Sequence, residues 1–318
     1  MRRGSLEYWP HRRAKKQMPR LRSWVELAEP SFANFVAFKT GMTHIGFTDD
    51  SNSPAKGTEI ISAATVLEIP RVFIYGIRLY HKTVYKEPAD EVYDKQLAAK
   101  IGIKKTEKTN LDSVKKDTSK YVDAAALAFL DPSSLGFGMK KLMRFEMHVG
   151  GKSIDEKIAF IAGFLGKEVK ITNFLKAGDY IDITGITKGK GWQGPVKRFG
   201  VARLYHKATG KTRHVGTLGP FHPPKVLYSV PMAGHMGYNY RTELNKRVMK
   251  VGSAASASEI NPSGAFPHYG VVRNDYLIVK GSVSGTPKRM VRIRKALRST
   301  YSEAQPQVKY VSLTAKQG

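Results

Sequence analysis

Hydrophobic and polar residues alternate along short stretches at both ends of the chain. The first such stretches are rich in β-branched and aromatic residues and are separated by turn formers: 32–38, 42–47, 59–69 and 71–80. The same pattern returns later, at 142–149, 168–172, 180–187, 269–283, 289–297 and 308–313. A period of two with this composition predicts strands, so we expect a mainly β protein.

Helical patterns occur between these groups of strands. The stretches 89–102, 121–130 and 153–166 carry Ala, Leu and charged residues in a spacing that suits helices. Ser153 lies three residues before Glu156, which predicts a capping box at the start of the third helix. Segment 87–165 is therefore predicted to be an α+β insertion.

The central segment differs from these stretches in composition and pattern. Residues 188–265 show many Gly and Pro and weak periodicity, so no long strand or helix is predicted there. We expect a β-barrel built from 31–86, 166–187 and 266–318, with a basic N-terminal extension at 1–30 and a basic central extension at 188–265. Basic, Gly-rich segments of this kind stay extended while a partner satisfies their charge and backbone.

Charge then indicates the class of partner. The chain of 318 residues carries 53 Lys and Arg against 26 acidic residues, a formal charge of +27. The positive charge gathers in residues 2–22, 188–250 and 288–298, and an excess of this size favours a polyanion such as RNA. A membrane surface is the competing polyanion, but no run approaches the ~18 apolar residues of a spanning helix. We expect a cytoplasmic protein that does not bind membranes.

The sequence G-x-G-x-x-G at Gly189, Gly191 and Gly194 raises the possibility of a nucleotide site. A dinucleotide site needs a helix and an acidic residue about 20 residues later, and no acid occurs until Glu243. Kinase and Walker motifs are also absent from the sequence. The remaining interpretation is a backbone-rich contact for RNA with Trp192 available to stack. The alternative is a glycine-rich hairpin with Trp192 in the core.

Several ordered motifs then match one known family. The stretches "GITKGKGWQGPVKRFG", "RHVGTLGPFHPPKV" and "MAGHMGYNYRTELNKRV" resemble the universal large-subunit ribosomal protein three family. The N-terminal "RRGSLEYWPHRRAKKQMPRLRSW" and "FVAFKTGMTHIG" are similar to its archaeal and eukaryotic branch. One departure is Phe221, because relatives in this branch usually have Trp at that position.

The resemblance implies a fold and a role. It implies a translation-protein type β-barrel near the subunit surface and extended arms that reach through ribosomal RNA (rRNA) toward the peptidyl-transferase centre. It also implies binding to 23S-type rRNA, a part in early subunit assembly, an influence of the central loop on the elongation-factor region, and neighbouring large-subunit proteins as further partners.

An enzyme is the alternative to an RNA-binding structural protein. It would be an RNA-modifying enzyme with a basic substrate channel. His206, His214, His222 and His235 lack helical i, i+4 pairing, and only Glu243 is near enough in sequence to orient one. Without cysteine, disulfides and thiolate metal sites are excluded. We expect no enzyme activity, no small-molecule substrate and no cofactor, with Mg²⁺ or K⁺ of the rRNA nearby.

The residues expected to bind rRNA are cationic, aromatic and polar side chains of the two arms. They are Arg2, Arg3, Trp9, His11, Arg12, Arg13, Lys15, Lys16, Arg20, Arg22, Lys188, Lys190, Trp192, Gln193, Lys197, Arg198, Arg203, His206, Lys211, Arg213, His214, Phe221, His222, Lys225, His235, Met236, Tyr238, Arg241, Lys246 and Arg247.

Overall fold

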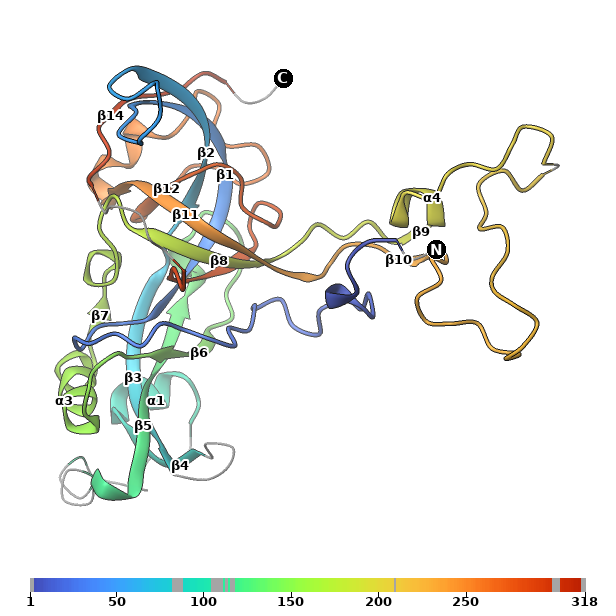
Figure 1. Cartoon of the computed structure of the whole chain (residues 1–318). Helices are drawn as coiled ribbons and strands as arrows, with labels where there is room; N and C mark the ends of the chain where they lie inside the picture. Colours follow the sequence, from blue (N-terminus) through green and yellow to red (C-terminus); the bar gives the residue numbers. More distant parts are fainter. Residues whose placement is uncertain are drawn as a thin grey trace. The chain divides into compact units, whose positions relative to one another are not determined.

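The protein forms two compact units (Figure 1). The computed structural model describes residues 3–81, 88–103, 111, 114, 118–208, 210–298 and 304–315. The arm unit consists of Met1–Gln17 and Ile186–Arg241, and the sheet unit consists of Met18–Gly185 and Thr242–Gly318.

Seven antiparallel strands form a ring-like sheet in the sheet unit (Figure 1). Their order is β13-β8-β11-β12-β2-β1-β14, and β13 also pairs with β1, which closes the ring. The strands are β1 (Asn34–Thr48), β2 (Glu59–Glu68), β8 (Tyr180–Ile186), β11 (Tyr240–Gly252), β12 (Tyr276–Lys280), β13 (Met290–Lys295) and β14 (Val308–Val311). The predicted mainly β class is confirmed.

Strand β1 closes the ring because it has two partners on one side. Its first residues, 34–38, pair with β13, and residues 45–47 pair with β14. The register of β1 with β2 shifts between Lys39 and Gly41, where a bulge bends the strand. Phe35 and Phe38 of β1 are fully buried in the main hydrophobic core.

A second sheet has the order β4-β3-β5-β6, and β7 also pairs with β3. Strand β3, from the segment 31–86 that was expected in the barrel, pairs in this second sheet. The strands are β3 (Arg71–His81), β4 (Pro88–Tyr93), β5 (Tyr121–Asp131), β6 (Met143–His148) and β7 (Glu168–Val169).

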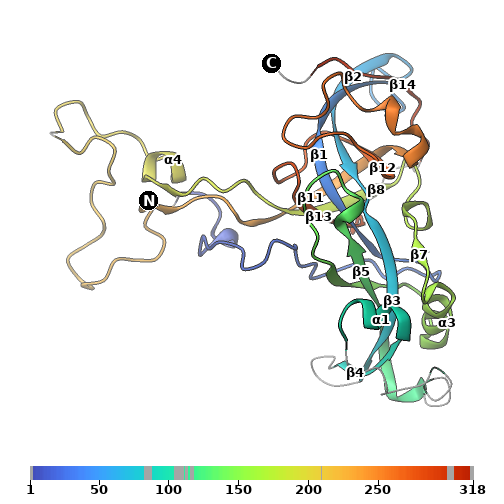
Figure 2. The same cartoon turned by 180° about the vertical axis from the view of Figure 1, so that it is seen from behind.

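Few helices accompany the two sheets. Helix α3 (Ile154–Phe164) packs against β3 and β5 and lies beside this sheet in Figures 1 and 2. Ser153 accepts a hydrogen bond from the backbone N–H of Glu156, so the predicted N-terminal cap is confirmed. Short 3₁₀ helices occupy Leu6–Tyr8, Thr118–Lys120, Pro132–Ser134, Ile171–Asn173 and Ala254–Glu259.

The prediction of a helix at 121–130 is wrong, because these residues form β5. This strand lies between β3 and β6, and residues 124–130 are all buried. A continuous apolar run is compatible with a buried strand or a buried helix, and here pairing on both sides overrides the helical propensity of alanine.

The helix predicted at 89–102 is only partly present. The first residues of this stretch pair with β3 as β4, and helix α1 begins only at Lys95 and ends at Lys100. The side chain of Asp94 accepts a hydrogen bond from the N–H of Leu97, and this cap fixes the start of the helix.

The expectation of no long strand in 188–265 is also wrong. Strand β11 runs for 13 residues from Tyr240 to Gly252. Exposed residues alternate with half-buried ones along its first part, and the half-buried ones are Arg241, Glu243 and Asn245. The first part of the strand therefore lacks the alternation of apolar and polar residues by which strands are predicted from sequence.

Candidate RNA interface

A two-stranded antiparallel stem begins the central segment of the arm unit. Strand β9 (Trp192–Gln193) pairs with β10 (Gly234–His235), and Figure 1 shows them side by side. Further hydrogen bonds extend the stem, because Lys190 N–H donates to Met236 O and Thr187 N–H donates to Asn239 O, both at 3.0 Å. The stem therefore spans residues 187–193 and 234–239.

The N-terminal segment lies along this stem. The N–H of Ala14 donates to the carbonyl of Tyr238 at 2.8 Å, and Asn239 Nδ2 donates to the carbonyl of Arg12 at 2.7 Å. Tyr240 Oη donates to the carbonyl of Lys16 at 3.2 Å. These contacts satisfy the backbone of the N-terminal segment while the side chains of Arg12, Arg13, Lys15 and Lys16 remain exposed.

The glycine motif ends in a single helical turn. Helix α4 runs only from Pro195 to Phe199 and stops at Gly200, which has a left-handed φ of 65°. The N-cap is Gly194, which has no side chain to cap the turn. A helix of five residues does not make the long dinucleotide-binding unit that the motif would require, so the exclusion of a nucleotide fold agrees with the structure.

Gly237 allows the two sides of the stem to approach each other. Its φ is +76°, and a Cβ atom at this residue would lie 2.1 Å from the carbonyl oxygen of Lys188. Any other residue would meet both a backbone collision and an unfavourable backbone conformation.

Aromatic rings fasten the N-terminal segment to α4. The ring of Phe199 stacks on Trp9 and on His11, each with centroids 5.1 Å apart. Tyr228 meets Trp9 edge to face at 6.2 Å. The rings of Trp9 and His11, both predicted RNA contacts, are thus half-buried in an intramolecular cluster. Trp192 lies outside it and is 76% exposed, so the alternative that placed Trp192 in a core is wrong.

A cationic cavity of about 280 Å³ lies beside the stem. We call it the stem pocket. It combines side chains of the N-terminal segment, the stem and α4, and it contains no acidic residue. Its lining residues are His11, Thr187, Lys188, Lys190, Arg198, His235, Met236, Gly237, Asn239 and Arg241.

Arg198 holds one wall of the stem pocket. Its Nε donates to the carbonyl of His235 at 3.0 Å and its Nη1 donates to the carbonyl of Met232 at 2.9 Å. The guanidinium packs over Gly234, where a Cβ would lie 2.8 Å from Nη1. Partial burial lowers the pKa of Arg198, and no carboxylate compensates it within the pocket.

Two histidines of the pocket lie among its cations. Burial, followed by the charges of Arg198 and Arg241, lowers the pKa of His11. The Nε2 of His235 is buried and has no hydrogen-bond partner. The guanidinium of Arg241 lies 4.1 Å from the centre of the Tyr8 ring. An incoming phosphate would satisfy these donors and reduce the repulsion among the cations.

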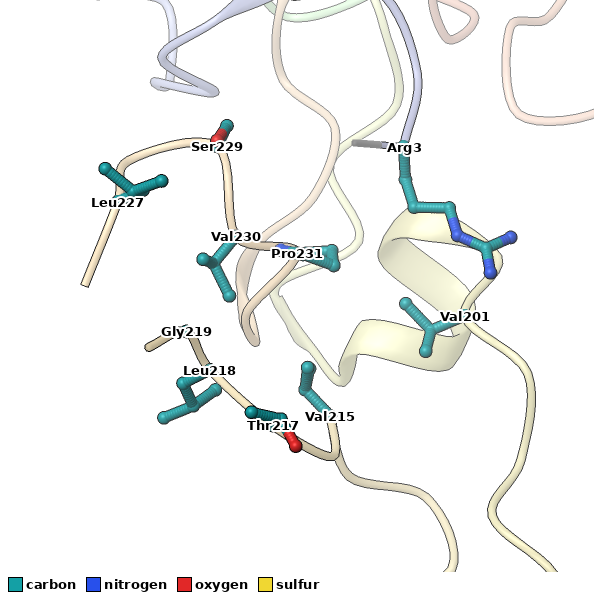
Figure 3. Close-up of a pocket in the computed structure, with 10 residues that line it drawn as sticks. All are labelled: Arg3, Val201, Val215, Thr217, Leu218, Gly219, Leu227, Ser229, Val230 and Pro231. Carbon is teal, nitrogen blue, oxygen red and sulfur yellow. The ribbon is translucent and has the colours of Figure 1, made fainter. Parts of the chain in front are cut away.

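Beyond the stem, residues 201–208 and 210–233 belong to a long loop that lines, together with Arg3, a hollow of about 460 Å³. Figure 3 shows Val215 and Leu218 on one stretch of the loop, with Leu227 and Val230 on another. Phe221 is 85% exposed, so its ring is no part of the protein's own core. The ring meets that of His222 edge to face at 4.8 Å.

The structure brings seven of the predicted residues together in the stem pocket: His11, Lys188, Lys190, Arg198, His235, Met236 and Arg241. A larger group is exposed elsewhere on the arm unit: Arg12, Arg13, Lys15, Lys16, Trp192, Lys197, Arg203, His206, Lys211, Arg213, His214, Phe221, His222 and Lys225. Tyr238 is half-buried in the stem. Arg2 lies outside the described residues.

Two polar side chains of the predicted set bind the backbone of their own unit. Arg3 Nη1 donates to the carbonyl of Gly200 at 3.4 Å, and Gln193 Nε2 donates to the carbonyl of Lys190 at 2.6 Å. Both bonds leave other donor positions of these side chains unused.

Four predicted residues lie in the sheet unit. Arg20 and Arg22 are exposed and line another cavity. Lys246 pairs with Glu243 at 2.8 Å, and Arg247 pairs with Asp50. Because both carboxylates neutralise these cations, an RNA contact by Lys246 or Arg247 would compete with an existing ion pair. Their role in RNA binding stays a prediction.

Sequence reasoning missed the residues that build the pocket without charge. Asn239 ties the N-terminal segment to the stem, and Phe199 holds the aromatic cluster. The sequence carries no local signal for these residues, because Asn239 and its partner Arg12 are 227 residues apart.

Almost no negative side chain balances the positive charge of the arm unit. Its two segments contain sixteen Lys and Arg and one acidic residue, Glu7. Within the described part of the chain, no three His, Asp or Glu side chains gather as a metal site would require. No helix among the described residues has the length and apolar character needed to cross a membrane.

Comparisons with known proteins identify relatives that match the whole chain. The family model described as "Ribosomal protein L3" matches residues 1–131 and 93–318. The large ribosomal subunit protein uL3 of Methanocorpusculum labreanum is 43% identical, over 99% of this chain and 98% of its own length. The proteins of the same name from Methanobrevibacter smithii and Methanocaldococcus jannaschii are 40% and 39% identical, over 100% of this chain and 98% and 97% of theirs.

These matches define the class as structural, non-enzymatic proteins of the ribosome. The chain belongs to the ribosomal protein L3 family, whose archaeal members carry the name uL3.

Proposed function

We propose that the chain is a constituent of the large ribosomal subunit that binds 23S-type rRNA through its arm unit. In this proposal the protein supports early subunit assembly and the architecture around the peptidyl-transferase centre. It works in cytoplasmic ribosomes beside neighbouring large-subunit proteins, and Mg²⁺ or K⁺ of the rRNA lie nearby.

We further propose a division of labour along the chain. Residues 1–30 and 188–265 are the RNA-binding extensions, and 87–165 are an insertion. The segments 31–86, 166–187 and 266–318 form the family's β-barrel, corresponding to the ring-like sheet. Strands β3 and β7 of these segments pair in the second sheet, and β11 of the segment 188–265 adds a strand to the ring.

The single observation that carries the proposal is the stem pocket. It gathers Lys188, Lys190, Arg198 and Arg241 without one carboxylate, and it includes a buried histidine nitrogen that lacks a partner. Like charges held together repel one another, so the arrangement is costly for a free protein. A phosphate provides the charge and the acceptor oxygens that the pocket lacks.

The exposed rings add a second kind of contact. Trp192 and Phe221 offer stacking area to unpaired bases, since every base has a π-face. Phosphate contacts fix register on RNA, whereas stacking selects single-stranded elements. Together they favour a folded rRNA with loops over a regular duplex.

The test is the salt dependence of binding to transcribed large-subunit rRNA. Lys188→Ala together with Lys190→Ala should reduce the slope of log affinity against log salt by roughly 1.4–1.8, since each lost phosphate contact removes about 0.7–0.9. Lys56→Ala, an exposed lysine of the sheet unit, is the control and should leave the slope unchanged. Equal slopes for both variants would reject the stem pocket as a phosphate site.

A further inference from the structure

Two buried arginines stand side by side on strand β13. Arg292 and Arg294 are two residues apart, so their side chains lie on the same face of the sheet. Each is only 7% exposed. They provide an internal comparison, because one has a counter-ion and the other does not.

Arg294 is fully compensated. Strand β8 places Asp182 opposite it, and the guanidinium meets the carboxylate with Nη2 at 3.0 Å and Nε at 3.1 Å from Oδ2. Its Nη1 also donates to the carbonyl and the hydroxyl of Ser23, at 2.6 and 2.7 Å. This pair is a structural element of the sheet unit.

Arg292 has no such partner. The residue opposite it on β8 is Thr184, whose hydroxyl lies 2.9 Å from that of Thr242. Arg292 donates from Nη2 to the carbonyl of Glu146 at 2.6 Å, and its Nε is buried without a partner. In the described part of the chain, no carboxylate forms an ion pair with Arg292. Burial lowers its pKa to about 10.

A cavity of about 520 Å³ opens beside Arg292. Arg20 and Arg22 also line it, and both are exposed. We call it the Arg292 pocket, and its lining also includes Trp24, Asp123, Phe145, Glu146 and His148.

Both carboxylates in this lining have a cationic partner. Asp123 pairs with Lys157 at 2.9 Å. Glu146 pairs with Arg78, which also pairs with Glu91 at 2.6 Å, and accepts a hydrogen bond from Tyr80 at 3.1 Å. Among the described residues no ion pair includes Arg292, whose guanidinium lies 5.6 Å from the centre of the Phe145 ring.

Burying a guanidinium without a counter-ion costs free energy, because the lost hydration of the charge is not compensated. An anion that enters the pocket supplies this compensation, and the paired donors of arginine match the oxygens of a phosphate. We propose that the Arg292 pocket is a second RNA site, which holds one backbone phosphate against Arg292 with Arg20 and Arg22 at its edge. This inference rests on the proposed function, since it takes rRNA as the source of the phosphate.

RNA is favoured over an acidic protein segment by the surroundings. Three arginines line the cavity, and Trp24 stacks on His148 with ring centroids 3.4 Å apart, so an aromatic wall stands beside the cations. Aromatic rings beside arginines are the usual environment of nucleotides in RNA-binding proteins. An acidic segment of a neighbouring protein is the competing occupant.

The first test compares Arg292→Met with Arg294→Met in the full chain. Methionine keeps an apolar stem and removes the charge. For Arg292→Met we expect a urea midpoint of the free protein equal to or above that of the unchanged chain, because an unpaired buried cation is lost. For Arg294→Met we expect a lower midpoint, because Asp182 is left buried and unpaired. A loss of stability in Arg292→Met as large as in Arg294→Met would make Arg292 a structural residue and overturn the proposal.

The second test uses Trp24 as the reporter in a full chain carrying Trp9→Phe and Trp192→Phe. We expect adenosine monophosphate and inorganic phosphate to change its fluorescence with saturation, and the added substitution Arg292→Met to abolish the change. A response to acetate as strong as that to phosphate would favour the acidic segment and reject the RNA site. No response to any of the three probes would also reject it.

The third test separates this inference from the proposed function. With large-subunit rRNA, Arg292→Met should reduce the salt slope by about 0.7–0.9. An unchanged slope, with binding otherwise normal, would reject the Arg292 pocket and leave the proposed function standing. Failure of the unchanged chain to bind the rRNA would reject the proposed function instead.

Discussion

The main chain of Gly237 lies so close to the carbonyl of Lys188 that a Cβ atom would come within 2.1 Å of that oxygen. Because backbone atoms cannot move aside as a flexible side chain can, Gly237→Ala should open the stem and disorder the stem pocket. We expect faster amide exchange at Lys190 and Met236, whose backbone hydrogen bond belongs to this stem.

Gly194→Ala is the matched control for this prediction. Gly194 has a φ of −70° and no atom near its would-be Cβ, so alanine should be tolerated. If both variants exchanged at the rate of the unchanged chain, the close contact at Gly237 would not limit the stem.

The second prediction concerns pH and His11. Its pKa is lowered from 6.5 by burial and by Arg198 and Arg241. The unfolded chain therefore binds this proton more readily than the folded chain, so stability is lost as pH falls through about 6.5 toward the lowered value. Once exchange is corrected for the pH dependence of the intrinsic amide rate, the protection of residues 187–193 should be lower at about pH 5.5 than at about pH 7.5.

The substitution His11→Gln tests the origin of this pH dependence. Glutamine keeps polar contacts but does not titrate in this range, so the difference between the two pH values should shrink. Besides the two arginines, Lys188, Lys190 and His235 line the same pocket. If the difference were the same in both proteins, the effect would have another source.

The third prediction concerns Glu68, a fully buried carboxylate in β2. Its Oε1 accepts from the N–H groups of Arg273 and Asn274, both at 3.0 Å, and from Asn274 Nδ2 at 2.8 Å, while Oε2 accepts from the Tyr269 hydroxyl. Glu68→Ala would leave these donors buried and unpaired, at about 1–3 kcal/mol for each unsatisfied group. Urea unfolding should show that Glu68→Ala lowers the free energy of unfolding by at least about 3 kcal/mol.

Glu59 on the same strand is the control. It is exposed, and its ion pair with Lys309 is long, at 3.7 Å. Exposed pairs contribute about 0–1 kcal/mol, so Glu59→Ala should barely change the unfolding free energy. Comparable losses for Glu59→Ala and Glu68→Ala would contradict the role given to buried hydrogen bonding.

The fourth prediction separates stability from function at Phe221. Since 85% of this residue is exposed, Phe221→Ala should leave the unfolding of the free chain unchanged. Under the proposed function, the ring stacks on an rRNA base, and its loss should cost about 1–3 kcal/mol of local stacking. Chemical probing of rRNA in subunits that carry Phe221→Ala should then show new reactivity near the peptidyl-transferase centre.

Phe221→Trp provides the counterpart, because it restores the aromatic residue that relatives in this branch usually carry. It should leave rRNA reactivity unchanged. Normal reactivity in Phe221→Ala subunits would argue against a stacking role for this ring.

Local pattern was enough to predict much of the ring-like sheet. Strands β8, β12 and β13 alternate or form short apolar runs within their predicted limits. Strand β5 was mistaken for a helix because its alanine-rich run has no strand signature of its own. Only its pairing with β3 and β6 determines the outcome, and this pairing leaves no mark in the sequence of the strand itself.

The candidate site was also predicted only in part from the sequence. Charge density identified the arms, and seven predicted residues do meet in the stem pocket. The sequence could not separate free cations from paired ones, as with Arg247 and its partner Asp50, which are 197 residues apart. It also could not reveal that Arg292 is buried without a carboxylate while Arg294 is matched by Asp182.

The bonds between the N-terminal segment and the stem have a consequence for biosynthesis. Asn239 reaches the carbonyl of Arg12 across 227 positions, and Tyr240 reaches that of Lys16 across 224. A ribosome makes the N-terminal segment first and the matching side of the stem only after most of the chain has emerged. Until then, water solvates the backbone carbonyls of the N-terminal segment, and its cationic side chains have no contact with the stem. Completion of the arm unit is therefore a late event in translation, timed by the appearance of residues 238–240.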